Sequence, residues 1–238
     1  MASIQEATAE VDTAVLTDGE EKALRKAFSR SLEDTRSLDT ETVVEKFREY
    51  MTEVEFAASV AKAQMDQQIG GQITTPNKVA ITQVEPEYFG YQDWDNIPDA
   101  TADTVTTWLD SSTPDELGGT GGEPVKVGDE AVHLVLGMGT YSSDEKARSF
   151  SFNVDRSLKT AVKAEAAFRN TDLMIQWLDQ PFLLYEDREI FGEFYSPFAG
   201  STAFYPVGIS FIDGKKARNI EPGTFYGTSV SGNVLVEQ

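Results

Sequence analysis

Residues 17–69 carry apolar side chains at the spacing of helices. Thr17-Asp18-Gly19-Glu20 has the spacing of a capping box, so a first helix is expected to begin at Thr17. Phe28 and Leu32 lie on its thin apolar face. A second, longer helix is expected from near Asp39 to about residue 68. Its apolar positions advance in steps of four and three residues: Val43, Phe47, Tyr50, Val54, Ala57 and Ala61.

This long stripe must pack against another surface before Gly70-Gly71 ends the helix. One interpretation places the helix on its own domain. The alternative makes it an inter-subunit helix or coiled coil, with Phe47, Tyr50 and Val54 as interface residues. The acidic residues that flank the stripe argue against a helix lying on an anionic membrane surface.

After the two glycines the apolar pattern changes to a period of two, which is typical of strands. The alternating or continuous apolar segments are residues 78–83, 105–108, 131–136, 150–154, 173–177, 182–185, 190–195, 202–205, 207–212 and 230–236. Short strands separated by Gly, Pro, Asn and Asp predict a sandwich or barrel. The expected fold is therefore mainly β: a helical arm, residues 1–71, followed by a single jelly-roll or β-sandwich domain, residues 72–238. Alternation leaves the strand order open, because jelly rolls and immunoglobulin-like sandwiches share it.

Three local features refine this picture. Asp213-Gly214 predicts a hairpin turn, because both central residues of a type I′ turn need positive φ. The alanine-rich segment Ser157–Arg169 favours a short helix, with a strand as the alternative. Ser111–Pro124, rich in Gly, Ser and Pro, predicts a long loop.

The chain is strongly acidic, with 40 Asp and Glu against 20 Lys and Arg and a net charge of -20. The charges are spread along the whole sequence, and 40% of the residues are hydrophobic, which indicates a folded protein with an acidic surface. Such a surface suits molar salt, where a Debye length of about 3 Å removes self-repulsion. An ordinary acidic protein is the alternative. The charge argues against nucleic acid as a direct partner.

The sequence offers no catalytic motif, so no enzyme activity, cofactor or small-molecule substrate is expected. There is no cysteine. The one histidine, His133, is interpreted as structural; alternation places it opposite Val132 and Leu134, or on the outer face of a strand. Asp93, Asp95 and Asp99 are weak candidates for a bound cation, with an Asx-capped turn as the simpler explanation.

Aromatic residues are concentrated in the second half of the chain, and one sandwich cannot easily bury all of them. Some are therefore expected at interfaces between copies, where Phe and Tyr supply large contact areas. The candidates are Phe198, Phe204 and Tyr205.

A helical arm, an aromatic-rich sandwich and a salt-adapted surface together resemble a virion structural protein. With Val207–Gly214 as the most suggestive stretch, residues 73–238 resemble the larger kind of single-jelly-roll major capsid protein of haloarchaeal, icosahedral, internal-membrane viruses. The resemblance implies a subunit without catalytic residues that assembles in the host cytoplasm and resides in the virion. It implies as partners further copies, a second capsid protein in pseudo-hexameric capsomers, and an underlying membrane by proximity.

Two other classes of protein fit the same pattern. The helical arm also suits a decoration, turret or tail protein of a tailed halovirus. A carbohydrate-binding or adhesion module would need an exposed aromatic platform and export, and the N-terminus carries no recognisable secretory signal.

Overall fold

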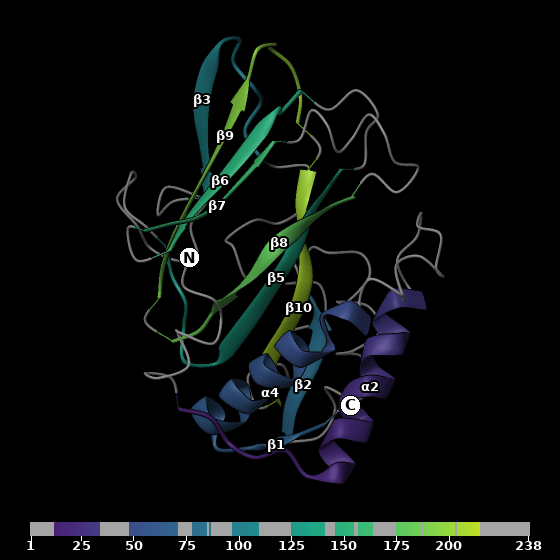
Figure 1. Cartoon of the computed structure of the whole chain (residues 1–238). Coiled ribbons are helices and arrows are strands. Elements are labelled where there is room, and N and C mark those ends of the chain that lie inside the picture. Colours follow the sequence, from purple (N-terminus) through teal and green to yellow (C-terminus); the bar gives the residue numbers. More distant parts are fainter. Residues whose placement is uncertain are drawn as a thin grey trace, which may run out of the picture.

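In the computed structural model of the chain, the described residues form two β-sheets that face each other and helices that cover one of them (Figure 1). The structure describes residues 12–33, 48–70, 78–84, 86, 97–109, 125–140, 146–154, 157–163, 175–186, 188–202 and 204–214. The predicted segments 111–124 and 230–236 lie outside this set, as do Phe47, Asp93 and Asp95.

The first sheet, which the helices cover, has the order β1-β2-β10-β5-β8. Its strands are β1 (Gln68–Ile69), β2 (Lys78–Gln83), β5 (Ala131–Thr140), β8 (Ile175–Leu184) and β10 (Phe204–Asp213). The second sheet has the order β3-β9-β6-β7, and β4 also pairs with β9. Its strands are β3 (Thr104–Leu109), β4 (Val125–Lys126), β6 (Ser149–Val154), β7 (Ser157–Lys163) and β9 (Glu189–Ser196).

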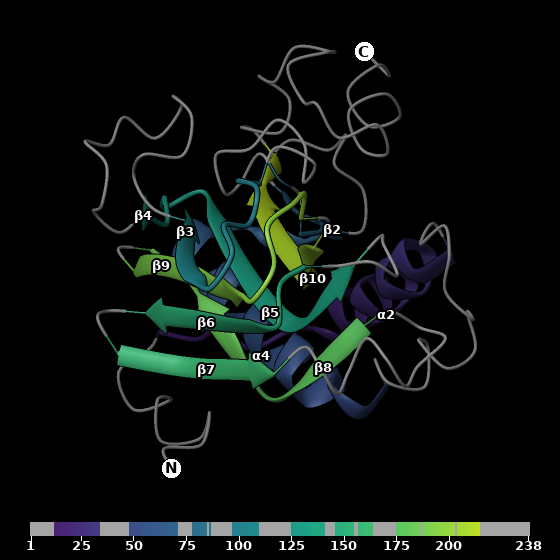
Figure 2. The same cartoon turned by 90° about the horizontal axis from the view of Figure 1, so that it is seen from above.

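This strand order is that of a jelly roll. Without the short β1 and β4, the sheet β2-β10-β5-β8 faces the sheet β3-β9-β6-β7, and all pairs are antiparallel. Successive strands lie in different sheets except for β6 and β7, which pair with each other. Figure 2, seen from above, shows β6, β7 and β9 crossing over the strands of the first sheet. The expected fold class, a mainly β single jelly roll with N-terminal helices, is confirmed.

The helices differ from the expected arm in their boundaries. α2 (Asp18–Glu33) begins where the capping box predicts. The second helix is not continuous from residue 39 to 68: within the described residues it is interrupted at Tyr50, and α4 runs over Met51–Met65. It ends at Asp66, whose φ of 45° is left-handed, and so stops before the glycines.

Some strands also differ from the expectation. Ser157–Lys163 is strand β7, paired with β6, so the favoured helix for this segment is wrong and tertiary pairing overrides alanine propensity. The expected strands 173–177 and 182–185 correspond to the single strand β8, of which Ile175–Leu184 are described. β8 leaves the ladder between Trp177 and Phe182, and Pro181 lies in this bulge of an edge strand.

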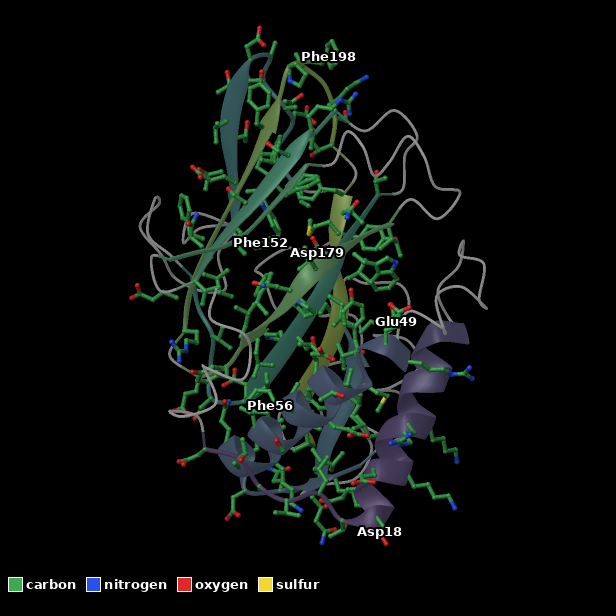
Figure 3. The ribbon with its side chains drawn as sticks, viewed as in Figure 1. Asp18, Glu49, Phe56, Phe152, Asp179 and Phe198 are labelled. Atoms are coloured by element: carbon green, nitrogen blue, oxygen red, sulfur yellow. The ribbon has the colours of Figure 1, made fainter. Side chains whose placement is uncertain are left out.

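The core has two layers. Between the sheets lie the largest buried rings, among them Trp108, Phe152 and Phe194 (Figure 3 labels Phe152). Between the first sheet and the helices lie Leu24 of α2 and the alanine-rich face of α4, which contacts β5 and β10. All of β5 is buried because it has a covered face on each side.

Candidate interaction surface

Two of the six expected interface residues belong to the core of the chain itself. Phe204 is fully buried between the sheets, where its ring lies 4.6 Å from that of Phe150 and 5.3 Å from that of Trp108. Val54 is fully buried where α4 packs on the first sheet. Alternation and helical spacing identified both as apolar positions. The second sheet covers Phe204 and the first sheet covers Val54, so neither is an interface residue.

Two further candidates are held by contacts within the chain. The Tyr50 hydroxyl donates a hydrogen bond of 2.8 Å to the Leu178 carbonyl, and its ring lies 6.1 Å from that of Trp177. Tyr50, the residue that precedes α4, is thereby attached to β8 of the first sheet. Tyr205 is partly buried against the inter-sheet core, and burial raises its pKa.

His133, expected to be structural, is buried and does not lie on an outer face. It lies opposite Val132 and Leu134 and is 3% exposed, because the second sheet covers this face of β5. Its Nδ1 lies 2.8 Å from the Ser210 hydroxyl on the neighbouring β10. Burial lowers the pKa of His133 to about 4, although the nearby Glu130 carboxylate opposes the shift.

Of the three aspartates considered for a cation, only Asp99 is described, and it is exposed. Within the described part of the chain, no group of three or more His, Asp or Glu side chains is arranged to hold a metal ion.

Phe198 is the expected interface residue that is exposed to solvent. It follows β9 at the end of the sandwich far from α2 (Figure 3). Phe198 is 54% exposed, and two further large apolar or aromatic residues are also exposed, Val105 at 55% and Tyr195 at 37%. These three residues, Val105, Tyr195 and Phe198, are called the β3–β9 patch below.

The register of the second sheet brings the patch together. Val105 of β3 lies directly across from Tyr195 of β9, and cross-strand partners of this kind are in side-chain contact distance. On β9 the even-numbered residues, such as Phe194, point into the core, so Tyr195 points out. The Tyr195 hydroxyl donates to an Asp103 carboxylate oxygen at 3.3 Å.

Arg148 joins the two aromatic members of the patch. Its backbone N–H donates to the Tyr195 carbonyl at 2.8 Å, and its guanidinium carbon lies 5.7 Å from the centre of the Phe198 ring. The Ser196 hydroxyl donates to the Phe198 carbonyl at 2.6 Å and accepts from the Phe198 N–H at 3.1 Å. These bonds hold the backbone of Phe198 in place although the residue lies outside a strand.

Among the described residues, side chains of both charges lie around the β3–β9 patch. Asp103 contacts Tyr195, and Glu193 lies two residues earlier on the same face of β9. Ala100 pairs with Gly200, which brings Asp99 to this end of the sandwich. Lys146 approaches Gly200, and Arg148 approaches Phe198. Of the charged side chains that the structure describes around the patch, three are thus acidic and two are basic, on a chain of net charge -20.

Sequence reasoning found Phe198 but missed Val105 and Tyr195. The signal was present, because strand alternation with buried Trp108 and Phe194 turns an odd-numbered Tyr195 outward. Only the pairing of β3 with β9 shows that the two exposed side chains are neighbours.

A scan against family models finds no match, and no curated protein matches the chain. Among solved structures, a cycloisomaltooligosaccharide glucanotransferase from Paenibacillus in complex with cycloisomaltoheptaose aligns with a TM-score of 0.20 and 12% identity. The alignment covers 52% of this chain and 19% of that one, so the chain spans about a fifth of its length. A likeness of this size carries no argument about fold or function. In the described part of the chain, no helix has the length and apolar character needed to cross a membrane.

Proposed function

We propose that the chain is a virion structural protein, the larger major capsid subunit of an icosahedral virus of a halophilic archaeon. It assembles in high salt with further copies of itself and with a related second subunit, over an underlying membrane. It has no catalytic role in this proposal.

The observation that carries the proposal is that the outer faces of the two sheets differ. Helices α2 and α4 cover the outer face of the first sheet, whereas the second sheet exposes Val105 and Tyr195 on its outer face. Jelly rolls occur in capsids, lectins and cupins, so the fold alone does not choose among them. Exposed apolar side chains on a rigid sheet favour association with another protein surface.

A carbohydrate-binding module is the second candidate, because Tyr195 and Phe198 are exposed aromatic residues. Sugar stacking needs a free ring face. The Arg148 guanidinium lies over the Phe198 ring, and Val105 lies beside Tyr195, so this arrangement suits a protein contact better than a sugar platform.

Negative-stain electron microscopy of the purified protein in about 2–4 M salt, where charge repulsion is screened, tests the proposal. We expect rings or capsomer-like oligomers of uniform size. Discrete monomers that bind glycans on an array would contradict it and favour the carbohydrate-binding module. Long tubes or tail-like assemblies would favour a tail protein of a tailed halovirus.

A further inference from the structure

We infer that the β3–β9 patch is the surface that binds a second copy of this chain, and that salt concentration controls this contact. The inference rests on the proposed function and adds to it the location of one self-association surface and its regulation.

The shape of the second sheet permits a close approach. β3 is an edge strand, and within the described residues it pairs with β9 alone. Residues 104–109 are Thr-Val-Thr-Thr-Trp-Leu, without a charge or a proline. Natural edge strands are usually protected by charged residues, proline or a covering segment. An uncharged edge beside exposed Val105 and Tyr195 is therefore suited to contact with another protein surface.

The charge distribution selects a second copy as the occupant. Two chains of net charge -20 repel each other, so their contact costs least where the local charge is close to neutral. As far as the structure describes the surroundings of the β3–β9 patch, they meet this condition, because Lys146 and Arg148 offset two of the three neighbouring carboxylate charges. A basic partner would instead bind the acidic remainder of the surface.

Salt weakens the charge repulsion between copies and strengthens the burial of apolar groups, so both effects favour association. At low ionic strength the Debye length reaches about 10 Å or more, and repulsion between the acidic surfaces opposes association. Molar salt screens this repulsion, and excluded salts also strengthen the burial of apolar groups such as Val105 and Phe198. Association through this patch is therefore expected to strengthen as salt is added, in contrast to a contact made by ion pairs.

Sedimentation velocity of the full chain, measured from about 0.15 to 3 M NaCl, tests the inference. The test variant is Val105→Thr with Phe198→Ser, and threonine is already the residue on both sides of position 105. The control is Val15→Thr, because Val15 is 88% exposed and precedes α2, on another part of the molecule. Circular dichroism and thermal unfolding show whether each variant folds. Phe198→Ser alone, which lies outside the strands, serves if the double variant does not.

We expect the wild type and Val15→Thr to associate more strongly as salt rises, and the double variant to require at least about tenfold more protein for the same association. Equal association of the double variant and the wild type would overturn the inference and leave the proposed function standing. Association of the wild type that weakens with salt would also overturn it. A wild type that is monomeric at every salt concentration would remove the proposed function itself.

Discussion

At the scale of the residue, His133 shows how the sandwich depends on a neutral side chain in its interior. The imidazole is buried between the sheets beside the Ser210 hydroxyl, and burial lowers its pKa from 6.5 to about 4. Between these two values the unfolded chain takes up a proton at this residue and the folded chain does not. This contribution to stability is complete above pH 6.5 and is lost as the pH falls to 4.

The His133→Asn variant tests this dependence, because asparagine has a hydrogen-bonding side chain that does not titrate. We expect the wild type to lose about 3 kcal/mol more unfolding free energy than the variant between pH 6.5 and 4. Urea unfolding of both proteins at pH 7, 5.5 and 4 measures the difference. Parallel pH dependences would show that the histidine is not buried in its neutral form.

The sequence predicted which residues His133 lies opposite but not what covers it. A single histidine without further nitrogen or sulfur ligands indicated a structural residue, and alternation placed it opposite Val132 and Leu134. Alternation cannot tell whether the second face of a strand is covered. That depends on the second sheet, whose position follows from pairings between residues distant in the sequence.

At the scale of the element, Glu20 fastens α2 to the rest of the chain. Its carboxylate accepts hydrogen bonds from the Lys62 ammonium at 2.7 Å and from the Ile69 N–H at 3.0 Å, which join α2 to α4 and β1. The Thr17 N–H and hydroxyl also donate to it, at 2.8 and 2.9 Å. Burial opposes ionisation, but these donors outweigh it and lower the pKa of Glu20 to about 2.

The Glu20→Gln variant removes the charge and keeps the shape of the side chain. Because Glu20 is nearly buried, we expect a loss of about 3 kcal/mol in unfolding free energy at pH 7. The carboxylate contributes fully above pH 4.5, and its contribution disappears as the pH falls through about 2. Urea unfolding measures both effects.

The exposed pair between Arg25 and Glu55 supplies the matched control. It joins the same two helices at 2.8 Å, but its side chains are 61% and 35% exposed. Glu55→Gln is therefore expected to cost less than about 1 kcal/mol. Equal losses from Glu20→Gln and Glu55→Gln would refute the description of Glu20 as the fastening residue.

Local signals predicted the start of α2 but not the limits of α4. The Thr17–Glu20 capping box is present, since the Glu20 N–H also donates to the Thr17 hydroxyl at 3.4 Å. Helical periodicity continued through Tyr50, where the helix is interrupted and the side chain bonds to Leu178 on β8. No property of neighbouring residues encodes that bond, which links positions 128 residues apart.

At the scale of the whole molecule, period-two alternation predicted a sandwich, and the pairing of distant strands determined which one. β10 lies between β2 and β5, so the last described strand is central in the first sheet. The composition of the candidate surface also depends on the strand pairings. Phe204 is buried on β10, whereas Val105 on β3 lies beside Tyr195 on β9. The sequence alone does not distinguish exposed from buried aromatic residues, because burial depends on how the two sheets pack.

The central claim is that copies associate through the β3–β9 patch of the second sheet and not through the helices. Hydrogen–deuterium exchange in low and high salt tests this claim most directly. Amides of β3 and of residues 196–200 are expected to gain protection in high salt in the wild type but not in the Val105→Thr, Phe198→Ser variant. The amides of α4, already packed on the first sheet, are expected to change equally in both proteins. Protection gained by α2 and α4 with β3 unchanged would contradict the account.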